Sequence, residues 1–379
     1  MAKIDDSVKK KVPELRFPGF TYDWEERKLS DIADRFDNLR VPITASDRKP
    51  GDTPYYGANG IQDYVEGFTH NGEFILVAED GANDLKNYPV QYVNGKVWVN
   101  NHAHVLQGKK TITDNKFLMN AIKNFNIEPF LVGGGRAKLN ADVMMKLNIL
   151  LPTFVEQEKI GSLFSLLDKT IALHQRKLDL LKEQKKGYLQ KMFPKNGAKV
   201  PELRFAGFAD DWEERKLGDI TKISTGKLDA NAMVENGKYD FYTSGIKKYR
   251  IDVAAFEGPS ITIAGNGATV GYMHLADNKF NAYQRTYVLQ EFLVDRSFIF
   301  SEIGNKLPKK IKQEARTGNI PYIVMDMLTE LKLSIPQNNS EQQKIGSFFK
   351  QLDDTIDLHQ RKLDLLKEQK KGFLQKMFV

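Results

Sequence analysis

Two histidines spaced two residues apart are the residues of this chain that most resemble a chemical site. His102 and His104 would point to the same face of a β-strand, where two imidazoles could bind a metal ion. No further ligand pattern lies nearby, and a strand with a polar face explains the same spacing. The chain has no cysteine, which excludes thiolate ligands, disulfides and cysteine nucleophiles. We therefore expect no metal site.

Three glycine-containing segments resemble phosphate-binding loops but lack the required spacing. GNGATVG at residues 265–271 departs from the dinucleotide fingerprint, and we expect it to join two strands. STGKL at residues 224–228 lacks the upstream glycine, and GGGRAK at residues 133–138 lacks the Lys-Ser/Thr ending. The Asn-Pro-Pro-aromatic motif of adenine methyltransferases is absent. We expect no catalytic residue and no cofactor in this chain.

Polar, aromatic and basic loops remain, and they occur at matching places in both halves. Arginine can bridge guanine, and asparagine or glutamine can bridge adenine, through paired hydrogen bonds in the DNA major groove. Lysine and glycine-rich backbone bind phosphates without reading sequence. The residues expected to contact DNA in the first half are Tyr55, Tyr56, Asn59, Asn83, Asn101, His102, His104, Arg136 and Lys138. Those in the second half are Thr243, Ser244, Lys247, Lys248, Asn266, Gln284, Arg285, Arg316 and Asn319.

The overall composition is that of a globular protein with a polyanionic partner. Hydrophobic residues make up 41% and charged residues 28%, and the net charge is +7. No apolar run approaches the roughly 20 residues that span a bilayer. The first ten residues carry charges where a signal peptide needs an apolar stretch. We expect a cytoplasmic protein that does not contact a membrane.

Comparison of the chain with itself reveals one unit used twice. KVPELRFPGF at residues 11–20 recurs as KVPELRFAGF at residues 199–208, and DWEERKL recurs soon after each copy. HQRKLDLLKEQKKGYLQKMF at residues 174–193 recurs at residues 359–378 with one change, tyrosine to phenylalanine. The sequence between these blocks differs but keeps landmarks such as Val-Leu-Gln. This pattern indicates a shared framework that presents two different surfaces.

Each variable region is predicted to mix strands and helices, so the expected fold class is α+β. FILVA at residues 74–78 is typical of a buried strand, and YVNGKVWV at residues 92–99 predicts a hairpin turning at Asn94-Gly95. SITIAG and TVGYMHL predict a second hairpin. Asp114 and Asp295 are candidate helix caps.

The repeated blocks that follow each region form a heptad pattern typical of a long helix with one apolar seam. A lone helix of this kind must bury its seam, so we expect the two copies to pair as an antiparallel coiled coil. The seam histidines could form a metal or proton site, but polar positions that fix the register of the pair explain them as well. The seam residues of the first copy are Ile160, Phe164, Leu167, Ile171, His174, Leu178 and Leu181. Those of the second copy are Ile345, Phe349, Leu352, Ile356, His359, Leu363 and Leu366.

These features divide the chain into six segments. Residues 1–21 form an N-terminal tail with the first framework segment, and residues 194–209 form a linker with the second. The two variable regions span residues 22–155 and 210–339, and the long helices span residues 156–193 and 340–379.

This ordered duplication resembles the specificity subunits of type I restriction-modification enzymes. VPELRF and DWEERKL before each region, and EQEKIG or EQQKIG with HQRKLDLLKEQKKG after it, carry the resemblance over nearly the whole chain. Membership would imply two target recognition domains, each reading one half of a split duplex DNA site, with the helices setting the gap. It would also imply two modification subunits that bind S-adenosylmethionine and methylate adenine, together with translocating restriction subunits. The chain itself would not be an enzyme.

Two other classes of function fit parts of the sequence. A coiled-coil scaffold without DNA contact explains the helices, but not why the globular regions diverged while the framework stayed nearly fixed. A single-strand or RNA binder would use aromatic side chains as stacking platforms, and the chain has 23 phenylalanines and 14 tyrosines. Most of these, however, belong to apolar patterns typical of cores.

Overall fold

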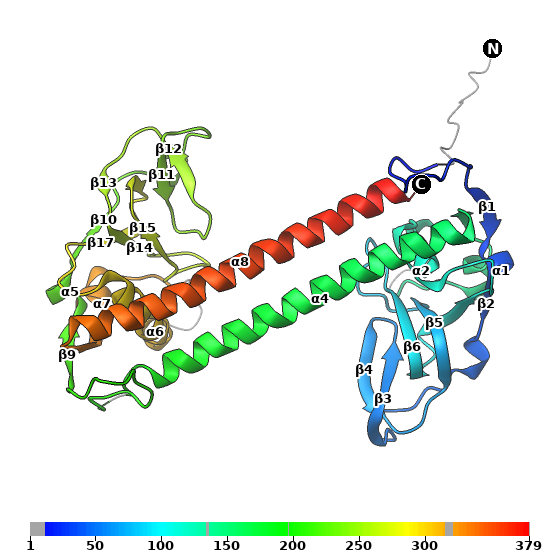
Figure 1. The fold of residues 1–379 in the computed structure, drawn as a ribbon, viewed down its shortest axis with the longest axis horizontal. Coiled ribbons are helices and arrows are strands. Elements are labelled where there is room, and N and C mark those ends of the chain that lie inside the picture. Colours follow the sequence, from blue (N-terminus) through cyan, green and yellow to red (C-terminus); the bar gives the residue numbers. More distant parts are fainter. Residues whose placement is uncertain (1–11, 134–135, 196, 315–320, 379) are drawn as a thin grey trace, which may run out of the picture. The chain divides into compact units, whose positions relative to one another are not determined.

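The computed structural model describes residues 12–133, 136–195, 197–314 and 321–378, and it divides into two units (Figure 1). The first unit comprises residues 1–175 and 362–379, and the second comprises residues 176–361. Each unit therefore holds one variable region together with a part of both long helices. The division differs from the six expected segments because the helices are shared between the units.

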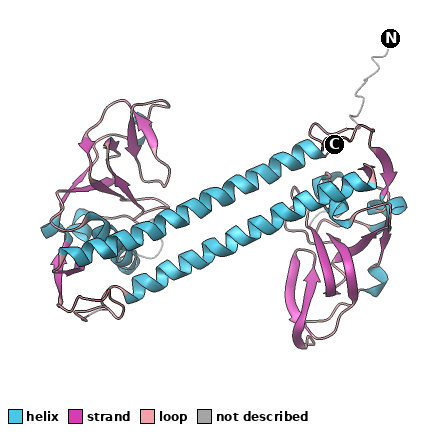
Figure 2. Ribbon diagram, in the orientation of Figure 1, coloured by secondary structure: helices cyan, strands magenta, loops and turns pink. Residues whose placement is uncertain are grey.

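A six-stranded sheet with the order β2-β7-β5-β6-β3-β4 forms the centre of the first unit (Figure 2). Neighbouring strands are antiparallel except for β3 and β6, which run parallel. These strands are β2 (Ala33–Arg35), β3 (Pro50–Gly57), β4 (Gly60–Val65), β5 (His70–Ala78), β6 (Val90–Val99) and β7 (Ala103–Gly108). The remaining short elements are β1 (Glu25–Lys28), β8 (Asn148–Leu151), α1 (Leu29–Ile32), η1 (Asp37–Leu39), α2 (Asn115–Asn124), η2 (Glu128–Phe130) and α3 (Ala141–Met144).

The second unit follows the same plan with its strands split between two four-stranded sheets, β10-β17-β14-β15 and β12-β11-β16-β13. β11 and β16 run parallel, as β3 and β6 do. The strands are β9 (Trp212–Lys216), β10 (Lys222–Thr225), β11 (Tyr239–Tyr242), β12 (Tyr249–Ile251), β13 (Phe256–Glu257), β14 (Ser260–Ala264), β15 (Met273–Ala276), β16 (Lys279–Ala282), β17 (Thr286–Gln290) and β18 (Lys332–Pro336). Besides the long helices, the second unit contains α5 (Leu217–Ile220), η3 (Ala230–Ala232), α6 (Arg296–Glu314) and α7 (Met325–Thr329).

One predicted hairpin is wrong and the other is confirmed. β6 runs straight through Asn94-Gly95, and Gly95 lies opposite Gly72 of β5. Gly95 has a φ of 99°, so it bends the strand without ending it. In the second unit, the stretch that corresponds to β6 is interrupted between β15 and β16. The second hairpin exists as β14 paired antiparallel with β15.

The two long helices are α4 (Phe154–Lys191) and α8 (Asn339–Met377), of 38 and 39 residues. Within the first unit, Lys370 of α8 forms an ion pair with Asp168 of α4. Within the second, Lys185 of α4 pairs with Asp353 of α8. The helices are antiparallel in each unit, and every predicted seam residue is buried or half-buried. In the described part of the chain, no helix has the length and apolar character needed to cross a membrane.

A buried ion pair fixes each framework segment to the first turn of a long helix. Glu156 has no exposed side-chain surface, and its two carboxylate oxygens accept hydrogen bonds from Arg16 at 2.7 and 2.8 Å. Glu341 and Arg204 repeat this arrangement at 2.6 and 2.8 Å. Since a buried carboxylate requires a paired cation, the arginine of each PELRF block and the glutamate of each EQ-x-KIG block form one contact.

The residue after this glutamate connects the helix to the variable region. Gln157 accepts a hydrogen bond from the Asp114 amide at 3.0 Å and donates one to the Pro152 carbonyl at 2.9 Å. Asp114 caps α2, as predicted, by accepting from the Phe117 amide at 2.7 Å. A Cβ atom at Gly161 would lie 2.4 Å from the Asp114 carboxylate, so the close approach requires glycine. The second copy repeats these contacts through Gln342, Asp295, Phe298, Pro336 and Gly346.

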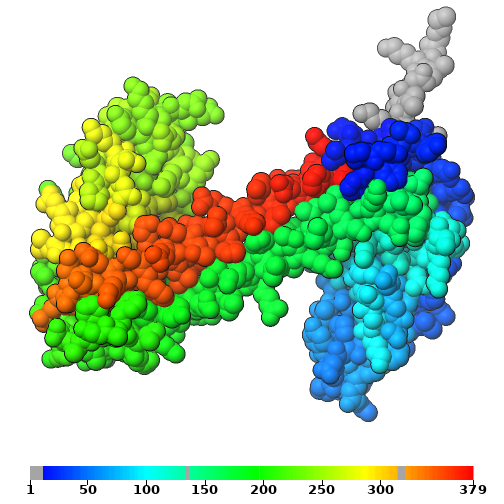
Figure 3. Space-filling model, in the orientation of Figure 1, coloured from blue at the N-terminus to red at the C-terminus, as the bar shows by residue number. Residues whose placement is uncertain are grey.

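An aromatic cluster closes the core of each unit. Trp24 meets Phe117 and Phe378 edge-on, with ring centroids 5.8 and 6.3 Å apart, and Phe378 also contacts Phe164. The end of α8 thus lies against the N-terminal framework segment (Figure 3). The equivalent cluster of the second unit consists of Trp212, Phe298, Phe193 and Phe349.

Glu156→Ala should lower the free energy of unfolding by about 3–5 kcal/mol, because it leaves the Arg16 guanidinium partly buried without its partner. Urea denaturation followed by tryptophan fluorescence measures this loss. Glu158→Ala, at an exposed position of the same helix turn, is the control and should have little effect. Equal losses from the two substitutions would contradict a structural role for the ion pair.

Candidate nucleic-acid interface

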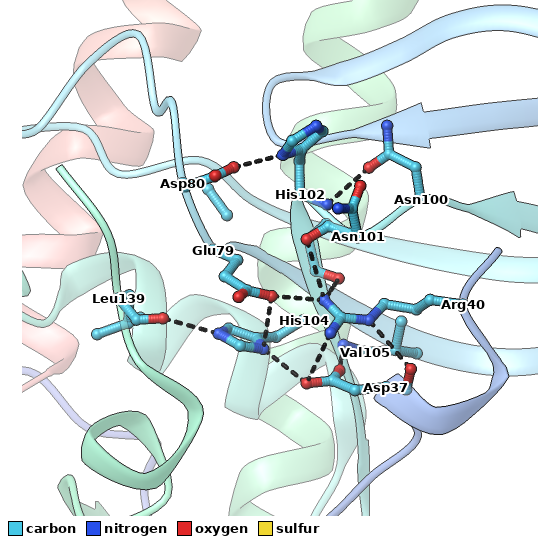
Figure 4. A network of polar contacts seen from close by, with 12 residues as sticks. Asp37, Arg40, Glu79, Asp80, Asn100, Asn101, His102, His104, Val105 and Leu139 are labelled. Carbon is cyan, nitrogen blue, oxygen red and sulfur yellow. Dashed lines mark hydrogen bonds and ion pairs between the residues drawn. The ribbon is translucent and has the colours of Figure 1, made fainter. Parts of the chain in front are cut away.

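Four segments of the first unit meet beside the C-terminal end of β5. They are the residues after β5, the residues before β7, the β3–β4 turn at Asn59 and the segment around Lys138. The Glu79 amide donates to the His102 carbonyl at 2.9 Å, and the Leu139 amide donates to the Glu79 carbonyl at 2.7 Å. Figure 4 shows the polar contacts of the side chains at this place. Main-chain hydrogen bonds therefore join three of these segments, the residues after β5, the residues before β7 and the segment around Lys138, independently of their side chains.

A buried polar network supports this end of the sheet. His104, only 1% exposed, contacts the Asp37 carboxylate through Nδ1 at 2.7 Å and the Leu139 carbonyl through Nε2 at 2.8 Å. Arg40 donates to Glu79 at 2.7 Å and to the Ala103 carbonyl at 2.9 Å. Burial acts to raise the pKa of Asp37, but the hydrogen bond and charge of His104 outweigh it and hold that pKa below its ordinary value. These residues position the loops.

Above this network lies a more exposed set of side chains. His102 bonds to Asp80 through Nδ1 at 2.5 Å, and Arg136 donates to the same carboxylate oxygen at 3.1 Å. Lys138 forms an ion pair with Glu79 at 2.9 Å. His102 and His104 thus have separate carboxylate partners and do not share a site, and no group of metal-ligating side chains occurs among the described residues.

Asn59 connects the β3–β4 turn to this set. Its side-chain nitrogen donates to the Gly81 carbonyl at 2.9 Å, and its side-chain oxygen accepts from the Asn83 amide at 2.9 Å. The structure therefore brings together six residues that the sequence predicted separately: Asn59, Asn83, Asn101, His102, Arg136 and Lys138.

The second unit contains the same main-chain arrangement at the end of β14. The Gly265 amide donates to the Arg285 carbonyl at 2.9 Å, and the Ile323 amide donates to the Gly265 carbonyl at 2.7 Å. Tyr287 donates its hydroxyl to the Ile323 carbonyl at 2.8 Å. It thus takes the place that His104 occupies beneath Leu139. We call these two arrangements the loop frames. The first consists of the main-chain contacts among Glu79, His102 and Leu139, and the second of those among Gly265, Arg285 and Ile323.

Different side chains stand on the two loop frames. An isolated β-bridge joins Asp80 to Lys138 in the first, and the matching bridge joins Asn266 to Tyr322 in the second. Ser244 donates to Asn266 at 2.5 Å. The exposed basic or amide side chains nearby belong to Lys247, Lys248, Gln284 and Arg285.

The structure corrects part of the predicted contact set. Tyr55, His104 and Thr243 are 1%, 1% and 9% exposed, because each lies in the interior of a sheet or loop frame, so their side chains cannot reach a ligand. Tyr56 is half-buried. Arg316 and Asn319 lie outside the described residues. Sequence reasoning did not single out Asp37, Arg40, Glu79 or Asp80, because their partners are distant along the chain.

The family described as the type I restriction modification DNA specificity domain matches the chain twice, at residues 22–183 and 209–368. A Haemophilus influenzae type I restriction enzyme specificity subunit is 46% identical over 136 residues, which is 36% of this chain and 35% of that protein. The MjaVIII specificity subunit of Methanocaldococcus jannaschii is 23% identical over 93% of this chain and 91% of its own.

A solved structure shares the fold. The crystal structure of a type I restriction-modification S subunit from M. genitalium has a TM-score of 0.79 at 18% identity and covers 97% of this chain and 99% of its own. Because the family matches both halves, the chain belongs to the family of type I restriction-modification specificity subunits. The match to the H. influenzae relative spans about a third of that protein's length.

Acidification should weaken the first unit through Asp37 and Glu79. Although burial acts to raise the pKa of Glu79, its hydrogen bonds from Arg40 and Lys138 hold that pKa below its ordinary value, as His104 does for Asp37. A carboxyl group with a lowered pKa contributes its full stability above its unfolded pKa, near pH 4, and loses it as the pH falls through the folded value.

Asp37→Asn should therefore destabilise the protein at neutral pH, and its difference from the unsubstituted protein should shrink below about pH 4. Urea midpoints measured from about pH 7 to about pH 3 test this. Asp34→Asn, an exposed change on β2, should retain the original pH slope. A difference that stays constant over this pH range would show that Asp37 does not act through its charge.

Proposed function

We propose that each unit reads one half of a split target in double-stranded DNA, through the side chains on its loop frame. The observation that carries this proposal is the pairing of two matching loop frames with different exposed side chains. Arginine, asparagine, glutamine and histidine are residue types that can pair with base edges, and lysine can bind either a phosphate or the edge of a guanine. The net charge of +7 favours the same partner.

We further propose that the long helices set the gap between the two half-sites. α4 is an unbroken helix of 38 residues, which corresponds to a length of about 57 Å. This is roughly one and a half turns of DNA at about 34–36 Å per turn. A rigid helix of this length would keep the number of unread base pairs constant.

The chain would perform no chemistry itself and would instead dock two modification subunits. Exposed leucines recur every seventh residue along α4, with Leu166, Leu173 and Leu180 at 64%, 67% and 51% exposure. Leu358 and Leu365 of α8 are each 59% exposed. Leucines at heptad spacing favour a helical partner. That partner would bind S-adenosylmethionine and methylate adenine, and two restriction subunits could join the complex.

Exchange of residues 22–155 for another variable region of the family should change one half-site and leave the other unchanged. Adenine methylation mapping in cells that also contain the cognate modification subunit measures both half-sites at once. Exchange of residues 210–339 is the reciprocal control and should change only the other half-site. A change of both half-sites by one exchange would contradict independent reading. Methylation that is unaffected by deleting the chain would favour the scaffold alternative, and preference for single strands would favour the stacking alternative.

Leu173→Glu combined with Leu358→Glu should weaken the binding of the modification subunit by about tenfold or more, because two leucines lose an apolar contact. Affinity measured with the purified modification subunit tests this. Gln184→Glu with Gln369→Glu adds the same charges at exposed positions of the same helices and should retain binding. Unchanged affinity in the leucine variant would exclude this helix face as the docking surface.

A further inference from the structure

We propose that three structurally equivalent positions on each loop frame determine which bases each half reads. The first position follows the central strand (Asp80 or Asn266), the second precedes the last strand (His102 or Arg285), and the third lies on the returning segment (Lys138 or Tyr322). We call these residues the reading triplets. The inference rests on the proposed function, since it assigns residues to base reading by the same two units.

The equivalence of the positions follows from main-chain contacts. His102 and Arg285 use their carbonyls to accept the amide of the residue that follows the central strand by one position, each at 2.9 Å. The third-position residues pair with the first-position residues through matching antiparallel bridges. None of these contacts uses a side chain of a reading triplet. The side chains can therefore differ while the frame is unchanged.

The residues of the reading triplets and the residues that support the frames also differ in their burial. His104 and Tyr287 lie beneath the frames and are 1% and 8% exposed. By contrast, Tyr322 is 60% exposed, the Lys138 side chain is 45% exposed, and Arg285 is exposed. The His102 and Asp80 side chains are 34% and 22% exposed, so they too are more exposed than the supporting residues.

Arg285 has the chemistry of a guanine reader. Its guanidinium is exposed, and no described residue accepts a hydrogen bond from its side chain. A guanidinium presents paired donors that match the O6 and N7 acceptors of guanine in the major groove. Neighbouring Asn266 accepts from Ser244 through its side-chain oxygen, which leaves its amide hydrogens as donors. The half-site read by the second unit should therefore contain a G·C pair recognised by Arg285.

His102 presents the opposite chemistry at the equivalent position. Its Nδ1 faces the Asp80 carboxylate at 2.5 Å, and a carboxylate can only accept, so Nδ1 donates its hydrogen. When the ring is neutral, Nε2 is then a hydrogen-bond acceptor, which suits the exocyclic amine of adenine or cytosine. The first unit should therefore not demand guanine at the matching base pair. The same frame can serve two half-sites because the residue at the second position offers a hydrogen-bond acceptor in the first unit and hydrogen-bond donors in the second.

The test uses the full chain with its modification subunit, methylation mapping, and binding to duplexes that differ by one base pair. Arg285→Ala should reduce the preference for one G·C pair of one half-site by about 10- to 100-fold and leave the other half-site unchanged. Arg250→Ala removes another exposed arginine of the same unit and should leave the motif intact. Arg285→Lys should keep the affinity and its salt dependence but lose the discrimination, because lysine lacks the paired donors.

Three results would overturn the assignment. An unchanged motif in a folded Arg285→Ala variant would remove Arg285 from base reading. Equal weakening on all duplexes with a reduced salt dependence would make it a phosphate contact instead. Failure of His102→Arg to create a new guanine preference in the other half-site would contradict the equivalence of the positions. A wild-type complex that shows no split motif would instead refute the proposed function itself.

Discussion

A carboxylate without exposed surface must have a cation beside it, and in this protein that requirement places the start of each long helix. Glu156 and Glu341 each accept two hydrogen bonds from an arginine in a framework segment. The adjacent glutamines continue from the same helix turn to the cap of α2 or α6 and to the end of the preceding strand. Because two adjacent residues of the first helix turn make all of these contacts, they fix the globular region to the start of its helix.

A small number of contacts also fixes each loop frame. Main-chain hydrogen bonds join the segments of each frame, and a buried side chain beneath it bonds to the returning segment, from His104 in one unit and from Tyr287 in the other. The two polar tips reach equivalent carbonyls at 2.8 Å in both units. The frames therefore depend on the backbone and on buried side chains, and the exposed side chains can differ between the two units. This separation explains how near-identical framework blocks accompany variable regions that share few residues.

The sequence predicted the parts of this arrangement that repeat or follow a period. The duplicated blocks, the heptad seam and the caps at Asp114 and Asp295 could be found because each depends on residues close together in the chain. The Asn94-Gly95 turn failed because glycine bends β6 as readily as it ends a strand. Burial of Tyr55 and the pairing of His104 with Asp37 depend on contacts between distant segments, which a single sequence does not reveal.

The contact of Trp24 with Phe378 has a consequence for how the chain is made. The second unit is continuous, from residue 176 to residue 361, so a growing polypeptide contains all of it before synthesis ends. The first unit is begun first, yet its aromatic cluster lacks Phe378 until the last residues of α8 emerge from the ribosome. Domains that emerge early usually fold early. Here the unit whose synthesis begins first is the unit whose core residues are all available last.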